Sequence, residues 1–188
     1  MIRILGICGS LRKDSFNRKL MQAVADAVPT GCQFMQAGIE GIPVYDGDLE
    51  VESGIPEAVQ RLQSAAEDAD GLILFSPEYN QGVPGPMKNA IDWMSRPPAR
   101  IADVFRDKPV ALAGATPGGG GTRTAQYAWL PTLRGLGTRP WFGGALYMAQ
   151  AGNLFDDQGA LKDDKDQERV AAFIEGFAGF CGLPKVVS

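Results

Sequence analysis

The sequence contains no histidine among its 188 residues, and this absence excludes several kinds of active site. A Ser-His-Asp triad, a Cys-His pair, a histidine general base and a histidine-bound metal all need an imidazole. The three cysteines are far apart and form no CxxC pair, so they indicate neither a zinc site nor a redox dithiol. Because each lies in an apolar stretch, we interpret Cys8, Cys32 and Cys181 as buried, reduced thiols. An enzyme of this composition is expected to take its reactive group from a cofactor.

The sequence also lacks an excess of positive charge and any long apolar run. Its net charge of −4 disfavours nucleic acid as a partner, because neutralising phosphates requires clustered Lys and Arg. No apolar stretch approaches the ~20 residues of a membrane span, and residues 1–7 have no signal-peptide anatomy. We therefore expect a cytoplasmic protein with no membrane partner. The 188 residues suit one well-filled α/β domain.

Short apolar runs alternate with stretches of helical spacing along the chain. Strands are predicted at residues 2–8, 32–36, 70–76, 109–115 and 138–142. Helices are predicted at residues 15–28, 56–68, 86–94, 123–136 (with Pro131 at a kink or boundary) and 164–180, and residues 38–54 are expected to be an irregular acidic connection. This alternation predicts a doubly wound parallel sheet with helices on both faces. Such sheets bind ligands beyond the carboxyl ends of their strands, so the loops after the first, third and fourth strands should form the site.

The loop after the first strand, residues 9–17, combines several groups that bind anions. A helix start offers unpaired N–H groups, and Ser10, Ser15 and Asn17 add side-chain donors. Arg12 adds a guanidinium that can contact a phosphate through two hydrogen bonds. The loop matches neither a Walker A sequence nor GxGxxG, which favours a single phosphate over a triphosphate or dinucleotide. The structural alternative is that Ser15 only caps the helix and Arg12 is only solvated.

The loops after the third and fourth strands have unusual compositions. Residues 77–86 hold three prolines and two glycines, which predicts a stiff loop able to hold the edge of a flat heteroaromatic ring through backbone N–H groups. Tyr79 is a candidate to stack on such a ligand or to direct its hydroxyl at it, whereas Trp93 is expected to pack in the core. Four consecutive glycines at 118–121 allow close approach of backbone to a ligand, although they are also compatible with a flexible connection.

These motifs carry a resemblance to a known family. The segments are GSLRKDSFN at 9–17, PEYNQGVPGPMKNAIDW at 77–93, the glycine loop at 116–122 and AGNLFDDQGAL at 151–161. Together they resemble the NADPH-dependent FMN reductase family, near its chromate and quinone reductase branch. The resemblance implies a three-layer flavodoxin-like α/β fold with a five-stranded parallel sheet of order 2-1-3-4-5, formed by residues 1–188 as a single FMN-binding domain.

The resemblance also implies which residues hold non-covalent FMN. The implied cofactor-binding residues are Ser10, Arg12, Ser15, Phe16 and Asn17 at the phosphate end, and Pro77, Glu78, Tyr79, Asn80, Thr116, Pro117, Gly118 and Gly119 around the ring. Backbone N–H groups at and near Asn80 would face the N5 and O4 side of the ring. Two roles for Glu78 stay open, contact with the cofactor or bracing of its loop. No catalytic side chain and no metal ligand is assigned.

The implied activity is reduction of a small-molecule electron acceptor by NADPH or NADH through a ping-pong cycle on bound FMN, in which the cofactor carries the chemistry. Quinones, chromate, azo dyes and free flavin all remain candidate acceptors. Two other functions also remain open: a flavodoxin-type electron carrier without NAD(P)H turnover, and a binding or sensor protein.

A homodimer or homotetramer is also implied. Some relatives assemble as tetramers through an Arg–Tyr–Glu contact. Arg123 and Tyr127 match two of its members with one residue of extra spacing, but residues 144–147 lack the acidic partner.

Overall fold

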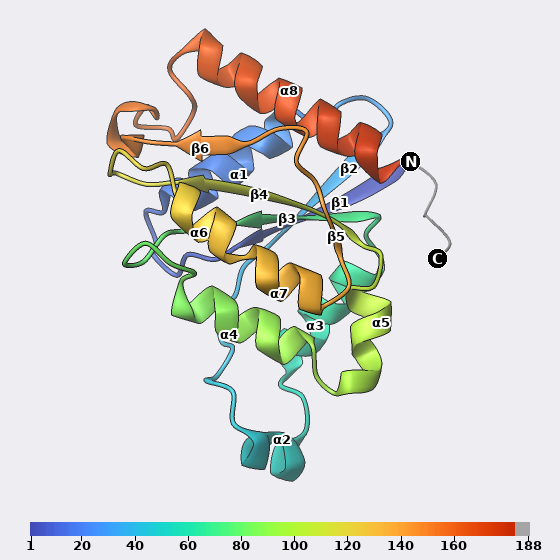
Figure 1. The fold of residues 1–188 in the computed structure, drawn as a ribbon. Helices are drawn as coiled ribbons and strands as arrows, with labels where there is room; N and C mark the ends of the chain where they lie inside the picture. The colour runs from blue at the N-terminus through green and yellow to red at the C-terminus, as the bar shows by residue number, and fades with distance from the viewer. Residues whose placement is uncertain (183–188) are drawn as a thin grey trace.

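The protein, described here over residues 1–182 by a computed structural model, is built around a parallel β-sheet (Figure 1). Its strands are β1 (Ile2–Cys8), β2 (Cys32–Ala37), β3 (Gly71–Phe75), β4 (Pro109–Ala115), β5 (Arg139–Pro140) and β6 (Leu146–Met148). The strand order is β2-β1-β3-β4-β5, with β6 also paired to β4, and every pairing is parallel. The predicted flavodoxin-like order 2-1-3-4-5 is confirmed.

Helices cover both faces of the sheet (Figure 1). They are α1 (Phe16–Asp26), α2 (Gly47–Ser53), α3 (Glu57–Glu67), α4 (Gly85–Met94), α5 (Ile101–Val104), α6 (Arg123–Ala128), α7 (Leu130–Gly135) and α8 (Asp164–Cys181), with 3₁₀ turns η1 (Pro98–Arg100) and η2 (Ala151–Asn153). Along β3, Leu72 and Leu74 pack toward α3 and α4, whereas Ile73 and Phe75 pack toward α1 and α8. Both side-chain rows are therefore buried, and each such residue contributes roughly 1.5–3 kcal/mol through burial.

The last strand differs from the prediction. Instead of one strand over 138–142, the chain forms the two-residue β5 beside the start of β4 and the separate β6 beside its end. Between them the chain leaves the sheet edge, and the Trp141 ring packs against Phe173 and Phe177 of α8 at centroid distances of 5.3 and 5.6 Å. A Cβ at Gly143 would lie 2.6 Å from Nε1 of Trp141, so this detour depends on the glycine.

One further segment departs from the sequence-based expectation, and a second shows the boundary predicted near Pro131. The connection at 38–54 is wrongly described as irregular throughout, because it contains α2, whose Asp46 cap accepts a hydrogen bond from the Asp48 N–H at 2.9 Å. The predicted helix 123–136 is divided into α6 and α7 at Trp129. Pro131 accounts for the boundary, since it has no N–H for the helical hydrogen bond.

The cysteines are free thiols, but only Cys8 is fully buried; Cys32 and Cys181 are half-buried, which corrects the prediction. Burial raises the pKa of the Cys8 thiol, and it raises the pKa of Cys181 to about 12. Both groups therefore stay protonated and unreactive near neutral pH. Within residues 1–182, none of the helices has the length and apolar character needed to cross a bilayer.

Candidate functional site

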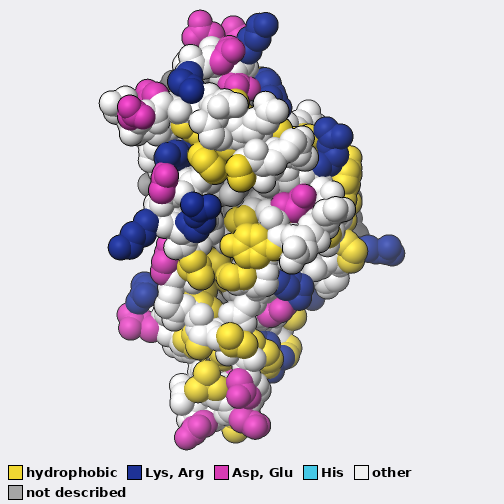
Figure 2. All heavy atoms as spheres, turned by 90° about the vertical axis from the view of Figure 1, so that its left-hand side faces the viewer, with side chains coloured by type: hydrophobic (Ala, Val, Ile, Leu, Met, Phe, Trp, Pro, Cys, Tyr) yellow, Lys and Arg dark blue, Asp and Glu magenta, His cyan; other side chains and the backbone are white. Residues whose placement is uncertain are grey.

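The loops after β1, β3 and β4 line one pocket at the carboxyl edge of the sheet. Of the predicted cofactor-binding residues, the pocket is lined by Ser10, Arg12, Ser15, Phe16, Asn17, Pro77, Glu78, Tyr79, Thr116 and Pro117, while Asn80, Gly118 and Gly119 are not part of its lining. Figure 2 looks onto this edge, where exposed apolar side chains gather near the centre with lysine and arginine side chains beside them. The three loops therefore meet at one pocket, as their positions after the strands predict.

Ser10 and Ser15 are both buried at the base of this pocket. Ser15 caps α1, since its Oγ accepts a hydrogen bond from the Arg18 N–H at 3.3 Å. The Ser10 Oγ similarly accepts from the Arg12 N–H at 3.4 Å. A hydroxyl that accepts one hydrogen bond can still donate its own proton, so capping leaves both serines able to donate to an anion.

Asn17 has a structural contact that the sequence did not reveal. Its Nδ2 donates to the Ala115 carbonyl and its Oδ1 accepts from the Ala115 N–H, both at 3.0 Å. This reciprocal pair fastens the first turn of α1 to the end of β4. It leaves one amide N–H of Asn17 for any ligand.

The charges of the first loop are arranged in favour of an anion. Asp14, its one acidic residue, pairs with Lys19 at 2.7 Å, and the pKa of Asp14 is lowered chiefly by this hydrogen bond. Arg12 is exposed at the rim of the pocket and forms no ion pair with any described residue. Its charge is therefore available to a phosphate.

The loop after β3 ends in a tight two-residue turn. Tyr79 and Gly82 exchange backbone hydrogen bonds of 3.3 and 3.0 Å around Asn80 and Gln81. Both of the latter residues are left-handed, with φ of 50° and 59°. Their N–H groups form no hydrogen bond within residues 1–182, and the Tyr79 side chain is 46% exposed beside them. The turn thus offers two backbone donors in fixed positions.

The glycine loop after β4 runs close against β6. A Cβ at Gly121, where φ is +60°, would lie 2.7 Å from the backbone of Tyr147, so a side chain cannot be placed there without displacing the strand. The start of the loop is fixed by backbone hydrogen bonds from Ala151 to Thr116 and from Gln150 to Gly118, each 2.9 Å. The segment 151–161 picked out in the sequence therefore begins by supporting this loop.

The family model described as NADPH-dependent FMN reductase matches residues 2–153. The chain belongs to this family. It is 42% identical over 169 residues to an NAD(P)H-dependent FMN reductase of Pseudomonas aeruginosa, with 90% of this chain and 89% of that protein covered. It is also 36% identical to an NAD(P)H:quinone oxidoreductase of Solanum tuberosum, covering 93% of this chain and 90% of the relative.

A solved structure agrees with the fold of this family member. The flavoenzyme NAD(P)H:(acceptor) oxidoreductase FerB from Paracoccus denitrificans superposes with a TM-score of 0.85 at 31% identity, covering 96% of this chain and 97% of FerB. The likeness extends over nearly the whole chain.

Sequence reasoning missed two residues that line the pocket of this FMN reductase family member, Asp14 and Ala115. The unpaired N–H group of Gln81 lies among the backbone donors expected near Asn80. Asp14 lies inside the quoted motif at 9–17, so it had a local signal. Ala115 had none, because only the sheet brings the end of β4 to α1.

Glu78 lines the pocket and also braces its loop. Its Oε2 accepts a hydrogen bond of 2.9 Å from the Ala125 N–H, in the first turn of α6. The bracing role that the sequence left open therefore has an observed partner, while contact of Glu78 with the cofactor stays a prediction.

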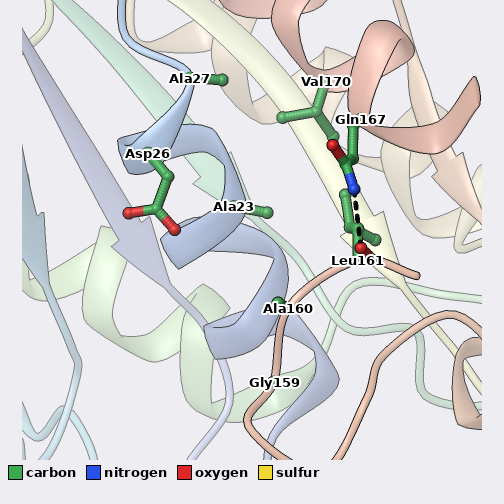
Figure 3. A pocket seen from close by; sticks show the side chains of 8 residues that line it. All are labelled: Ala23, Asp26, Ala27, Gly159, Ala160, Leu161, Gln167 and Val170. Atoms are coloured by element: carbon green, nitrogen blue, oxygen red, sulfur yellow. Dashed lines mark hydrogen bonds between the residues drawn. The ribbon is translucent and has the colours of Figure 1, made fainter. Parts of the chain in front are cut away.

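A second hollow, of about 290 Å³, lies between α1, residues 159–161 and the start of α8 (Figure 3). Ala23 of α1 and Ala27, which directly follows this helix, project into it, and Gln167 donates to the Leu161 carbonyl at 2.9 Å on the opposite side. None of the predicted cofactor-binding residues lines it, so it is separate from the candidate site.

Proposed function

We propose that this protein is an FMN-dependent NAD(P)H oxidoreductase that reduces quinones and similar small acceptors, chromate among them, by two-electron transfer. The observation that carries the proposal is the single pocket formed by the three loops. It combines a helix N-terminus and a free guanidinium at one end with unpaired backbone donors near the other. Relatives of this chain that carry the names FMN reductase and quinone oxidoreductase support the same activity.

The phosphate end fits the proposed cofactor. Ser10, Ser15 and Arg12 surround the start of α1, whose first N–H groups have no partner within the helix. The pocket encloses about 90 Å³, well below the roughly 300–1,000 Å³ of a typical ligand cavity. It is therefore suited to the phosphate group, and the rest of FMN would have to lie on the open face beside the loops at 77–82 and 116–122.

At the end of the site proposed for the flavin ring, the protein contributes backbone donors in fixed positions more than charge. Asn80 and Gln81 hold two N–H donors rigidly, because the turn that carries them is closed by the Tyr79–Gly82 pair. Donors held in place before binding lose little entropy when they orient a planar edge. When bound, FMN supplies the hydride acceptance from NAD(P)H and the transfer to the acceptor, which we propose occur as two successive half-reactions. The protein residues bind and orient, and no side chain of the pocket is assigned a proton transfer.

Reconstitution with FMN followed by steady-state kinetics tests the proposal. We expect the purified protein to bind FMN, show a flavin absorption spectrum and oxidise NADPH or NADH when a quinone or chromate is added. Parallel lines in double-reciprocal plots would support the ping-pong order. An FMN-bound protein inert to both nicotinamides would instead indicate an electron carrier. A protein that does not bind FMN would contradict the proposal entirely.

We further propose that residues 1–188 act as one FMN-binding domain in a cytoplasmic homodimer or homotetramer, the last six residues lying outside the described part. The exposed Tyr127 and Phe142 support self-association. The Arg123 guanidinium lies 5.0 Å from the centre of the Tyr147 ring, and Tyr147 belongs to the stretch 144–147 that lacks the expected acidic partner. The pKa of Tyr147 is raised, chiefly because the side chain is partly buried and secondly because it forms a hydrogen bond with Tyr127. Sedimentation equilibrium of the purified protein would distinguish monomer, dimer and tetramer.

A further inference from the structure

Helix α6 begins without a cap from its own cap residue. Thr122, at the cap position, is left-handed with φ of 59°, and its Oγ1 accepts from Gln126 Nε2 at 3.1 Å instead of from the helix backbone. The acceptor for the first turn is Glu78, whose Oε2 lies 2.9 Å from the Ala125 nitrogen. The start of α6 is therefore capped by a residue 47 positions earlier in the chain.

This hydrogen bond connects two loops of the candidate site. Glu78 lies in the loop after β3, whereas α6 directly continues the glycine loop after β4. Gly118, Gly119 and Gly120 are exposed, so side-chain packing does not fix the position of this part of the loop. The loop is supported at its start by the hydrogen bond from Gln150 and at its end by the helix that Glu78 caps.

A second contact behind the site supports the same connection. The Trp129 indole is fully buried, and its Nε1 donates to the Ser76 Oγ at 2.9 Å, immediately before the loop after β3. A Cβ at Gly114 would overlap both Ser76 and Thr122, so the glycine lets the bases of the two loops touch. Because the bases of the two loops are in contact, the distance between the loops can vary only at their outer parts, where Glu78 makes its hydrogen bond.

We propose that Glu78 is a positioning residue that sets the spacing between the loops at 77–82 and 116–122, and so prepares the surface on which the flavin ring binds. The proposal rests on the proposed function. The properties of Glu78 that matter are the length of its side chain and its hydrogen bond to Ala125. Its negative charge is not required.

Three substitutions separate reach from charge. Glu78→Gln keeps the length and an acceptor oxygen, Glu78→Asp keeps the charge but is one methylene shorter, and Glu78→Ala removes both. In titrations followed by flavin fluorescence, we expect the Ala and Asp variants to bind FMN about tenfold more weakly, the upper end of what loss of one hydrogen bond produces, and the Gln variant to stay within about threefold of wild type. Glu52→Ala, an exposed carboxylate on α2, is the matched control and should change nothing.

Amide hydrogen exchange of the FMN-free protein gives an independent measurement. Residues 118–125 should exchange faster in the Ala and Asp variants, and at the wild-type rate in the Gln variant. A Gln variant as defective as Ala in both measurements, or an Ala variant indistinguishable from wild type, would overturn the proposal. If wild type binds no FMN, the proposed function fails, while the exchange of residues 118–125 still decides whether Glu78 holds the loops together.

Discussion

The two ends of the candidate site are organised on different physical principles. The loop after β1 uses charge and a helix start, and the cap from Ser15 to Arg18 spans only three residues. The loop after β3 uses backbone shape, with left-handed Asn80 and Gln81 and a brace from Glu78 to a helix 47 residues away. An anion attracts any suitably placed donors, whereas the edge of a flat ring needs donors at fixed positions. The end that would bind the ring edge therefore depends more on contacts with residues distant in the sequence.

The largest expected effect comes from removing charge and cap together at the first loop. The double substitution Arg12→Ala and Ser15→Ala should weaken FMN binding about 100-fold, because one guanidinium and one hydroxyl donor are lost, while the fold stays intact. Fluorescence titration measures the affinity and far-UV circular dichroism checks the fold. Arg134→Ala, which removes an exposed arginine at the end of α7, is the control. Undiminished affinity would mean that the first loop does not hold the phosphate.

The next effect concerns stability more than binding. Asn17→Ala should lower the free energy of unfolding by roughly 1–3 kcal/mol, because the buried N–H and carbonyl of Ala115 lose their partners. Urea denaturation measures this change, with the exposed Gln33→Ala on β2 as control. Equal stability of the two variants would show that the Asn17–Ala115 pair contributes nothing.

A smaller effect tests whether the second loop acts through its backbone. Gln81→Gly should raise the free energy of unfolding by up to about 1 kcal/mol, because glycine adopts the left-handed conformation without the Cβ penalty. FMN affinity should stay within about twofold of wild type, since the backbone N–H is retained. Gln81→Val is the matched contrast: a branched side chain disfavours this φ, so both stability and affinity should fall. If Gly weakens FMN binding as much as Val, the side chain of Gln81, and not its backbone, is what the ligand contacts.

The smallest effect is the pH dependence of the first loop. The pKa of Asp14 is lowered in the folded protein by Lys19, so its stabilising contribution is present above the unfolded pKa of about 3.9, and is lost as pH falls through the folded value. The difference in Tm between wild type and Asp14→Asn should therefore be constant near neutral pH and shrink in acid. Because Asp14 is exposed, added salt should reduce this difference. A difference that grows on acidification would contradict the ion pair.

Much of the fold follows from local sequence signals. The strands at 2–8 and 109–115 match β1 and β4 residue for residue, because continuous apolar runs can only be buried in the centre of such a sheet. The split of the last strand did not follow, since it depends on Trp141 packing against α8, which begins more than twenty residues later. The helix α2 was missed because a short acidic segment carries no apolar stripe to indicate a helix.

By itself the sequence determined the alternation of strands and helices and the three loops that carry unusual residues, because apolar periodicity, caps and glycine or proline clusters act over a few neighbouring residues. Only the tertiary structure decided how those loops hold one another. The contacts from Asn17 to Ala115 and from Glu78 to Ala125 join residues 98 and 47 positions apart. A polar side chain in the sequence indicates that a hydrogen-bond partner is needed, but not which residue that partner is. The partner is determined only when the sheet brings distant segments together.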